Sequence, residues 1–591
     1  MLSRVNGGAR AETVQQLLDP GRDFGASGLR FVDRAERERF LGWGEVVARA
    51  RATAGRLAAA GVAPGERVAL VYPTAPGFFD AFFGTLLAGA VPVPLYPPVR
   101  LGRLEEYHQR TARLIAAVGA RLVLVDGRVA GLVGVAVERA GPGVAGRRLD
   151  ELPPAPPLAR HGDPGDLALV QFSSGTTVEP KPVALTQRAV LAQVAALNAQ
   201  WPDTSEVTHS GVSWLPLYHD MGLIGCVFPA LERPGTLTLV PPEAFVGRPA
   251  LWLRAIARHR ATISVAPNFA YALAAERVTD RDLEGLDLGA WRIALCGAET
   301  VAADTLRAFA ARFAAHGFRA EALAPVYGLS EAALAVTFPP LGTGLRALRV
   351  ERERLAGLGE AHDEAAGREI VSVGRPLAGF ELELRDERGR RLDERRVGRL
   401  FVRGPSLFEG YLGRPEQTAR VLVDGWLDTG DLGFLDGGEL FLTGRAKDVL
   451  ILRGRNHDPA DVELAVAGLE GVRPGCVAAC ADRPEGADTD RLRLFVERPR
   501  GASGPPSAEL ERACREAVLR HAGLVVDDVV VLEAGTLPRT SSGKIRRGET
   551  LARHLAGRLD APPEPGALGL AREGLRGRRA LGRARGAERA R

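Results

Sequence analysis

Small hydroxyl side chains and one of the few lysines of the chain gather in the stretch Gln171–Pro182, QFSSGTTVEPKP. Its glycine lets the backbone approach a ligand closely, and Lys181 supplies a positive charge, so the stretch has the groups that hold a polyphosphate. The apolar run Leu167–Phe172 before it predicts a short buried strand, and Leu185–Asn198 after it has helical spacing. A strand, a hydroxyl-rich turn and a helix start together predict an anion site.

This stretch is not a Walker A motif, because the glycine before the lysine is missing and Pro182 follows it where Ser or Thr would coordinate a metal ion. A surface turn rich in Ser and Thr stays open as an alternative. Motifs for a nucleophilic serine are also missing, since no G-x-S-x-G elbow occurs and Ser541-x-x-Lys544 lacks the companion motifs of the penicillin-binding group. Covalent serine catalysis is therefore disfavoured.

Four further patches have side chains that could do chemistry. WLPLYHDMG places His219 beside an aspartate, and a positioning or gating role is favoured over a metal site because no second His follows at helical spacing. CGAET, over Cys296–Thr300, ends an apolar run with a Gly turn and an acid. VYGLSEA offers the aromatic face of Tyr327 and the carboxylate of Glu331, and LDTGDL supplies Asp431 on a tight turn suited to receive hydroxyls. Taken singly, each patch could be ordinary turn chemistry.

Lysine is rare in this chain. Of the 77 Lys and Arg residues only Lys181, Lys447 and Lys544 are lysines, and each lies in a Gly- or hydroxyl-rich segment. A bias this strong toward Arg indicates genome composition, so each remaining lysine is a candidate for a function of its own.

Size and composition indicate a globular protein of more than one domain. A chain of 591 residues with 46% apolar residues exceeds what one hydrophobic core supports. The charge-free segment Ala81–Val99 carries four prolines, which favours a helix running into a buried strand over a membrane span. No signal peptide is evident at the N-terminus, so cytoplasmic residence is expected. The five cysteines are odd in number and spread out, which disfavours a disulfide framework or a zinc site.

Alternating strand and helix patterns organise the first 370 residues. Strands are expected at Arg67–Tyr72, Ala90–Leu95, Arg121–Val125, Leu167–Phe172, Thr236–Val240, Ile263–Val265 and Arg292–Leu295, and helices at Trp43–Ala60, Phe78–Leu87, Leu251–His259 and Ala302–Ala315. This alternation predicts an α/β domain with mostly parallel sheet. From about residue 371 short strands with Gly and Pro turns predict a β-rich subdomain, and after Arg445 a second α/β domain of about a hundred residues follows.

The C-terminal end carries the excess positive charge. Residues 571–591 contain eight Arg and two Glu, a net of +6, whereas the whole chain has a formal net charge of +5. With Gly and Ala interleaved and no aromatics, this tail is predicted to be disordered, and contact with nucleic acid or a membrane is the less favoured alternative.

The patches, taken in order, resemble the superfamily of adenylate-forming enzymes, which includes acyl-CoA synthetases, peptide-synthetase adenylation domains and firefly luciferase. The likeness covers roughly residues 30–555 and rests on SSGTTVEPK, YGLSEA, GWLDTGDLG, GRAKD and LPRTSSGKIRR, in the family's order. Within the superfamily the chain looks most like the fatty acyl-AMP ligases, through SWLPLYHDMGLIG, RGPSLFEGYLGRPEQT and RGRNHDPADVE. The charged stretch Leu345–Glu369 resembles the insertion that is thought to hold the small domain of those ligases back from a CoA-using pose.

The resemblance implies an α/β fold and a domain order. A large multi-sheet N-terminal domain, with αβαβα layers of parallel sheet and a small β-barrel subdomain, would span residues 1–444, with the subdomain at about 371–444 and the insertion at about 341–371. A smaller, mobile α/β C-terminal domain would span residues 445–557, and the basic tail 558–591.

The resemblance also implies roles for the motif residues. The phosphates of ATP would be held by Ser173, Ser174, Gly175, Thr176, Thr177 and Lys181, and the nucleoside by Gly297, Ala298, Glu299, Tyr327, Gly328, Leu329, Ser330, Asp431 and Arg445. Lys544 would reach the α-phosphate and the attacking carboxylate, His219 would line the acyl tunnel, and Lys447 would lie at the hinge. Glu331 and Thr176 would bind Mg²⁺, which prefers few carboxylates plus phosphate oxygens. Activation of an acid in this way is mostly positioning and electrostatics.

The implied reaction is ATP-dependent activation of a fatty acid to an acyl-adenylate, followed by acyl transfer to an acyl carrier protein or the carrier domain of a polyketide or peptide synthase. An acyl-CoA synthetase and a non-catalytic nucleotide- or acyl-binding relative stay open as alternatives; no nucleic-acid partner or membrane span is expected. The chain departs from the family pattern at Val178 and Pro182, where glycines are usual, at Gln187, where His is frequent, and at Asp458, where an aromatic is more usual. None of these removes a group that would bond to substrate.

Overall fold

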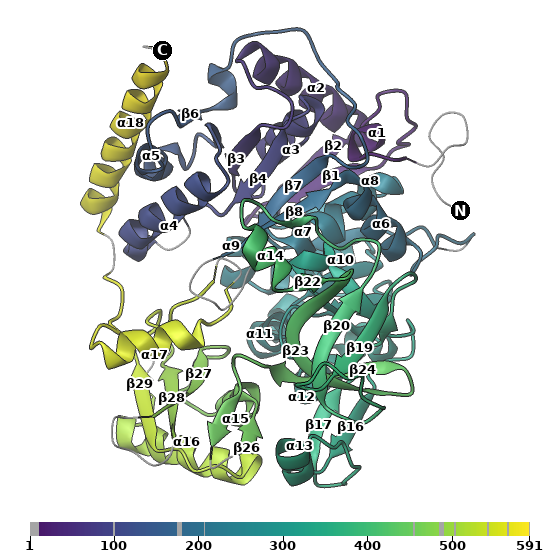
Figure 1. Ribbon diagram of the computed structural model, residues 1–591, viewed down its shortest axis with the longest axis vertical. Helices are drawn as coiled ribbons and strands as arrows, with labels where there is room; N and C mark the ends of the chain where they lie inside the picture. The colour runs from purple at the N-terminus through teal and green to yellow at the C-terminus, as the bar shows by residue number, and fades with distance from the viewer. Residues whose placement is uncertain are drawn as a thin grey trace.

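The computed structural model describes residues 11–98, 101–173, 180–205, 207–452, 455–483, 490–501, 504–540, 543–563 and 566–589. Figure 1 shows a large α/β domain above and to the right and a small α/β domain at the lower left, with the last helix lying against the upper left of the large domain. The predicted fold class is confirmed, because several sheets with flanking helices, a β-rich subdomain and a small C-terminal α/β domain are all present.

Two sheets with mostly parallel strands form the centre of the large domain. The first has the order β13-β12-β11-β9-β10-β1-β2 and is parallel except for the hairpin of β1 and β2; the second has the order β4-β3-β5-β6 and is parallel throughout. The strands of the first sheet are β13 (Leu323–Pro325), β12 (Ile293–Cys296), β11 (Ile263–Ala266), β9 (Gly211–Ser213), β10 (Leu237–Leu239), β1 (Gly28–Val32) and β2 (Glu38–Gly42). Those of the second are β4 (Val91–Leu95), β3 (Arg67–Val71), β5 (Leu122–Val125) and β6 (Ala145–Arg147).

Helices cover these sheets. They are α1 (Val14–Leu17), α2 (Trp43–Ala59), α3 (Pro76–Leu87), α4 (Leu104–Ala117), α5 (Ala130–Arg139), α6 (Gln187–Asn198), α7 (Asp220–Gly222), α8 (Phe228–Glu232), α9 (Pro242–Gly247), α10 (Ala250–Arg258), α11 (Asn268–Arg277) and α12 (Ala303–Phe313). Helix α3 buries apolar side chains on nearly all sides and runs directly into β4, so the charge-free segment from residue 81 is a buried helix and strand, as predicted. None of the helices in the described ranges combines the length and apolarity that crossing a membrane requires.

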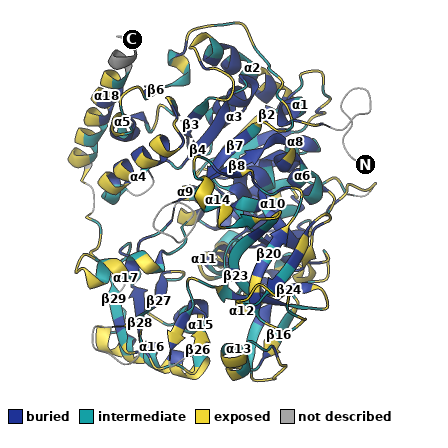
Figure 2. Ribbon diagram, viewed as in Figure 1, coloured by how far each residue is buried: buried dark blue, intermediate teal, exposed yellow. Residues whose placement is uncertain are grey.

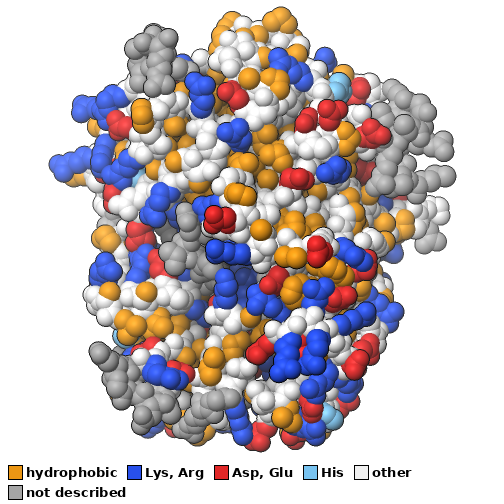
Figure 3. All heavy atoms as spheres, viewed as in Figure 1, with side chains coloured by type: hydrophobic (Ala, Val, Ile, Leu, Met, Phe, Trp, Pro, Cys, Tyr) orange, Lys and Arg blue, Asp and Glu red, His pale blue; other side chains and the backbone are white. Residues whose placement is uncertain are grey.

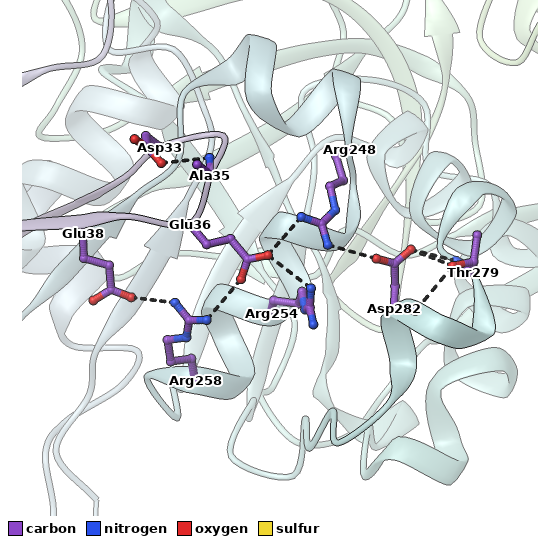
Figure 4. Close-up of polar contacts among 9 residues, drawn as sticks. All are labelled: Asp33, Ala35, Glu36, Glu38, Arg248, Arg254, Arg258, Thr279 and Asp282. Atoms are coloured by element: carbon purple, nitrogen blue, oxygen red, sulfur yellow. Dashed lines mark hydrogen bonds and ion pairs between the residues drawn. The ribbon is translucent and has the colours of Figure 1, made fainter.

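A cluster of ion pairs fixes the first hairpin of the large domain to helix α10. Glu36, in the turn between β1 and β2, accepts hydrogen bonds from Arg248 at 3.0 Å, Arg254 at 3.1 Å and Arg258 at 3.1 Å (Figure 4). Arg248 also reaches Asp282 at 3.2 Å. Exposed pairs contribute little singly, but a network converging on one carboxylate holds the turn in place.

The β-rich part follows the parallel sheets. Its main antiparallel sheet has the order β19-β20-β23-β22 with β24 added beside β23, and the predicted insertion forms a hairpin with a helix at its tip. The strands of this sheet are β19 (Glu381–Arg385), β20 (Gly398–Arg403), β22 (Leu422–Val423), β23 (Trp426–Asp436) and β24 (Glu439–Arg445). The insertion contains β16 (Ala347–Val350), α13 (Arg352–Leu358) and β17 (Arg368–Val371). The region also includes β14 (Tyr327–Gly328), β15 (Ala335–Phe338), β18 (Arg375–Pro376) and α14 (Pro415–Ala419). Val350 and Ile370 of the insertion pack on Phe434 and Phe441, so the insertion is seated on β23 and β24.

The strands on either side of the hydroxyl-rich stretch form an antiparallel hairpin. Strand β7 (Leu167–Phe172) pairs antiparallel with β8 (Pro182–Thr186), and β21 (Gly410–Tyr411) pairs with the other edge of β8. The predicted helix Leu185–Asn198 is present as α6 (Gln187–Asn198), where the Thr186 side chain caps it. The buried strand β8, which was not predicted, lies between the hydroxyl-rich stretch and this helix. The predicted residues Ser174, Gly175, Thr176 and Thr177, with Val178, lie outside the described residues.

The small domain has its own core. It contains a hairpin of β25 (Leu450–Leu452) and β26 (Arg455–His457), a sheet of β27 (Val477–Asp482), β28 (Arg491–Glu497) and β29 (Asp528–Leu532), and the helices α15 (Pro459–Val466), α16 (Ser507–Ala522) and α17 (Arg547–Leu555). Buried aliphatic side chains of β28, α15 and α16 meet in this core, and Figure 2 shows the outward face of α16 exposed. The boundary at residue 444 stays a prediction.

The C-terminal tail is ordered where it is described. Residues Ala567–Arg589 form helix α18, which lies beside α5 of the large domain (Figure 1). This differs from the predicted disorder, and the packing gives the reason. Gly577 lies against the backbone of Gly131 so closely that an added Cβ would be 1.8 Å from its carbonyl oxygen, and Leu581 is buried below. Small residues let the helices approach, and this docking orders a segment whose composition alone predicts disorder.

Candidate active site

One cavity of about 210 Å³ brings most of the predicted residues together from both domains. Those that line it are Ser173, Lys181, His219, Ala298, Tyr327, Gly328, Leu329, Ser330, Glu331, Arg445, Lys447 and Lys544. Gly297, Glu299 and Asp431 do not line it but adjoin or bond to residues that do. On the face drawn in Figure 3, Lys and Arg side chains are dense across the middle of the molecule.

The end of the cavity beside the β7–β8 hairpin carries both signs of charge. Glu331 accepts a hydrogen bond from the Tyr411 hydroxyl at 2.8 Å, and Lys181 Nζ lies 3.4 Å from the same hydroxyl. Burial lowers the pKa of Lys181, an effect that Glu331 opposes and Lys447 reinforces. The loop closes through Ser173, whose N–H donates to the Lys181 carbonyl at 2.9 Å. This end can therefore receive an anion together with a cation.

A second group of polar contacts joins Tyr327 to strands β23 and β24, the last two strands before the small domain. Asp431 on β23 accepts a hydrogen bond from the Tyr327 hydroxyl at 2.6 Å and another from Arg445 Nε at 2.8 Å. Its backbone N–H donates to Thr429 Oγ1 at 3.0 Å. Burial, and then Asp431, raise the pKa of Tyr327 far above its ordinary value, so its hydroxyl stays a donor. The buried carboxylate is fixed beside an aromatic ring, an arrangement suited to a nucleoside.

The turn after β12 has a constrained backbone. Ala298 has φ +70°, in the left-handed region that non-glycine residues rarely adopt, and it lines the cavity. Gly297 has no room for a side chain, since an added Cβ would lie 2.8 Å from the Val326 carbonyl oxygen. Glu299 accepts a hydrogen bond from the N–H of Phe269 at 2.6 Å, and burial raises the pKa of this carboxyl. These contacts hold the turn against the cavity wall.

His219 belongs to a chain of three side chains. Its Nδ1 lies 2.6 Å from Asp220 Oδ1, and Ser330 Oγ donates to Asp220 Oδ2 at 2.5 Å. Burial alone would raise the pKa of Asp220, but the charge of His219 and the hydrogen bonds from His219, Ser330 and the Met221 N–H lower it to about 2. The other ring nitrogen, Nε2, is buried and has no hydrogen-bond partner in the described part of the chain. The aspartate thus orients the imidazole and leaves Nε2 to meet a ligand.

Lys544 enters this cavity from the small domain. Its loop is closed by Thr540, whose N–H donates to the Lys544 carbonyl at 2.7 Å and whose Oγ1 accepts from the Lys544 N–H at 3.1 Å. Burial lowers the pKa of Lys544, and Arg445 lowers it further, whereas Asp220, Glu299 and Asp431 raise it. The lysine therefore experiences the charges of three carboxylates that come from separate elements of the large domain.

Lys447 lies where the chain passes between the domains. The preceding N–H, of Ala446, donates to the Gly430 carbonyl at 3.0 Å, and the following Asp448 pairs with Arg547 of the small domain at 3.6 Å. Residues with contacts to both domains on either side of a short segment are typical of a hinge. The hinge role of Lys447 stays a prediction, although its side chain lines the cavity.

Beyond His219 the cavity continues into an apolar region. Its wall is made by Leu197, Trp201, Met221, Gly225, Val265, Leu295, Leu334, Ala335 and Phe338. A π-helical turn over Leu223–Val227 follows α7 here, a local widening that is frequent at functional sites. The apolar region is suited to a hydrocarbon chain whose polar end lies near His219.

Sequence reasoning missed several members of this site. Asp220 and Tyr411 stood in quoted motifs, beside His219 and after Gly410, but only the fold shows that they contact predicted residues. Gln187, which stands where His is frequent in the family, is buried and accepts a hydrogen bond from the Val14 N–H at 2.9 Å, so it joins α6 to α1. The apolar wall comes from several separate elements, and no local signal could have assembled it.

Comparison with known proteins places this site in a family. A family model described as AMP-binding enzyme matches residues 28–412. A putative acyl-CoA synthetase of Caulobacter vibrioides is 38% identical over 557 residues, covering 91% of this chain and 95% of its own length. A medium-chain-fatty-acid–[acyl-carrier-protein] ligase of Moorena producens is 34% identical over 557 residues, covering 90% and 92%. A structure from work on fatty acyl-adenylate ligases of E. coli and L. pneumophila has a TM-score of 0.86 at 32% identity, covering 94% of this chain and 99% of that one.

Proposed function

The chain belongs to the AMP-binding family of adenylate-forming enzymes, and on this premise we propose that it activates a fatty acid to an acyl-adenylate and passes the acyl group to the phosphopantetheine thiol of an acyl carrier protein. One observation carries the proposal: a single cavity is lined both by charged side chains, among them Lys181, Glu331 and Lys544, and by a set of apolar side chains that includes Phe338. A carboxylic acid with a long hydrocarbon chain has this division of polarity.

The first half-reaction requires few groups from the protein. A carboxylate oxygen attacks the α-phosphorus of ATP, the acyl–O–P bond forms, and the bond from the α-phosphorus to the bridging oxygen breaks as pyrophosphate leaves. Lys544, whose pKa is lowered by burial but raised by the charges of Asp220 and Asp431, would stabilise charge on the α-phosphate and the attacking carboxylate. His219 Nε2 would meet the carboxylate, and Lys181 would hold the departing phosphates.

Residues near Lys181 fit a magnesium ion. Members of this family generally use Mg²⁺, which when bound neutralises phosphate charge. One carboxylate plus phosphate oxygens is the donor set that Mg²⁺ prefers, and Glu331 supplies such a carboxylate on the cavity wall. Thr176, the other predicted ligand, lies outside the described residues.

The insertion supports a carrier protein over CoA as acyl acceptor. Arg368 of the insertion pairs with Asp458 at 2.8 Å and Asp461 at 2.9 Å, both in the small domain. In the fatty acyl-AMP ligases that the chain resembles, such an insertion is thought to hold the small domain away from the CoA-using pose. The Moorena relative, named as a ligase for acyl carrier protein, points the same way.

An acyl-CoA synthetase is the second candidate, because the Caulobacter relative carries that name. Pyrophosphate release measured across a series of fatty acids tests the first half-reaction, and thioester formation with CoA or with a phosphopantetheinylated carrier protein tests the second. We expect acid-dependent pyrophosphate release and thioester on the carrier alone. Ready accumulation of acyl-CoA would favour the synthetase, and no acid-dependent release would leave a non-catalytic relative.

A further inference from the structure

Tyr411 contacts both charged groups at the phosphate end of the cavity. Its hydroxyl donates to Glu331 Oε1 at 2.8 Å, and Lys181 Nζ lies 3.4 Å from the same oxygen and 4.4 Å from the centre of the ring. One side chain therefore meets a carboxylate and an ammonium of opposite charge.

The backbone around Tyr411 is built to hold this side chain in place. Strand β21 pairs antiparallel with β8, with Tyr411 opposite Val183, two residues beyond Lys181. Thr418 Oγ1 accepts a hydrogen bond from the Tyr411 N–H at 2.9 Å and donates to the Arg414 carbonyl at 3.1 Å. The ring packs against Phe408 with centroids 5.0 Å apart. The tyrosine is thus fixed through its strand, its N–H and its ring.

Gly410 explains why the motif reads EGYLGRPEQT. Its φ is +150°, and an added Cβ would lie 2.9 Å from Thr418 Cγ2 and 3.0 Å from its Oγ1. A side chain here would push Thr418 away from the Tyr411 N–H. Gly410 and Thr418 of this motif therefore hold the Tyr411 backbone in place. The proposed acid activation by itself gives these two residues no role.

We propose that Tyr411 is a positioning residue that holds Lys181 and Glu331 at fixed places before ATP and its metal ion bind. This rests on the proposed function, in which Lys181 meets the phosphates and Glu331 the metal ion. The hydroxyl stands between the two groups as a donor to one and an acceptor for the other. Without it, the ammonium and the carboxylate can pair directly, and each would then be withdrawn from its ligand.

The test is Tyr411→Phe, which removes the hydroxyl and keeps the ring. We expect the Kd for MgATP, measured by calorimetry without fatty acid, to rise about tenfold, because hydrogen bonds to two charged groups are lost. The Mg²⁺ concentration for half-maximal pyrophosphate release should rise in parallel, whereas the KM for fatty acid and the Tm should stay at the wild-type values. Thr418→Val should shift the MgATP Kd in the same direction by less.

Tyr72→Phe is the matched control, because the Tyr72 hydroxyl is buried but has no hydrogen-bond partner among the described residues. It should leave the MgATP Kd unchanged. An unchanged MgATP Kd in Tyr411→Phe would overturn the proposal. A lower Tm, together with a fold-increase in the fatty-acid KM as large as the fold-increase in the MgATP Kd, would also overturn it, since that pattern indicates a general loss of structure around the cavity. The proposed function is tested separately: wild-type protein that binds MgATP but releases no pyrophosphate with any acid would overturn acid activation and leave the Tyr411 measurement valid.

Discussion

Asp220→Asn is the sharpest test of the site, because one buried carboxylate there accepts three hydrogen bonds. His219 Nδ1 lies at 2.6 Å, Ser330 Oγ at 2.5 Å and the Met221 N–H at 2.7 Å. The amide of Asn has nearly the same shape but only one accepting oxygen and no charge. The substitution therefore removes the negative charge that lies beside the His219 imidazole, and it does so without opening a cavity.

The size of the effect follows from the pKa of Asp220, which these contacts lower from 3.8 to about 2. Each unit corresponds to about 1.4 kcal/mol, so the ionised carboxylate stabilises the fold by about 2 kcal/mol. Because the folded-state pKa is depressed, this contribution is fully present above pH 3.8 and is lost as the pH falls through about 2. At pH 7 the variant should lose all of it.

Calorimetry measures the Tm of Asp220→Asn, and pyrophosphate release measures its rate of adenylation. Unfolding entropy is about 2.1 cal/mol/K per residue, so for the large domain a loss of about 2 kcal/mol lowers the Tm by about 2 °C. Adenylation should fall on the order of tenfold or more, as is usual when the partner that orients a histidine is removed. Combined with His219→Ala, the loss should be much smaller than the sum of the single losses.

Two results would refute this reasoning. If Asp220→Asn has the wild-type Tm and rate at pH 7, the carboxylate does not carry the stabilisation calculated for it. If the losses of Asp220→Asn and His219→Ala add fully, the aspartate does not act through the imidazole.

Three further substitutions address Lys544, the insertion and the last helix. Lys544→Ala should reduce acid-dependent pyrophosphate release by orders of magnitude, because a charged group serving the transition state is lost. Wild-type release would contradict the assignment. Arg368→Met should cost about 3 kcal/mol in the contact between the insertion and the small domain, because the buried Asp458 and the half-buried Asp461 lose their cation. Faster hydrogen exchange in α15 would report this loss, and unchanged exchange would argue against it. Gly577→Leu should release α18, since a Cβ there meets a backbone oxygen at 1.8 Å; limited proteolysis should then cleave the helix early, and a resistant helix would show that the docking tolerates a side chain.

Much of this architecture could be predicted because the order of residues along each short segment determines whether it forms a strand or a helix. Each strand expected between residues 67 and 296 is present within about two residues of its expected ends. Apolar runs of four to six residues between turn signals predict buried strands well. Residues of YGLSEA and the three lysines also line one cavity, although they come from separate elements of both domains.

Tertiary contacts decided the features that the sequence could not give. Pro182–Thr186 has an apolar pattern that fits the start of a helix as well as a strand, and only pairing with β7 and β21 makes it a strand. Helix α18 has the composition of a disordered tail and gains its order from the close approach of Gly577 to Gly131. Tyr411 meets Glu331 across 80 positions of sequence, a separation that no local rule spans.

Asp458, a departure from the usual family pattern, connects the fold with the choice of acceptor. It caps α15 through the Ala460 N–H at 3.0 Å and pairs with Arg368, so an aromatic residue at this position would leave the insertion without that partner. Rotation of the small domain away from the pose that places Lys544 in the cavity must break this pair and the contact of Arg553 with Glu106 on α4. Because rotation returns both partners to water, breaking the pair costs less than removing one partner and leaving the other buried. A carrier protein that docks on the enzyme can offset this cost with its own binding free energy, whereas a small free thiol has far less surface with which to do so.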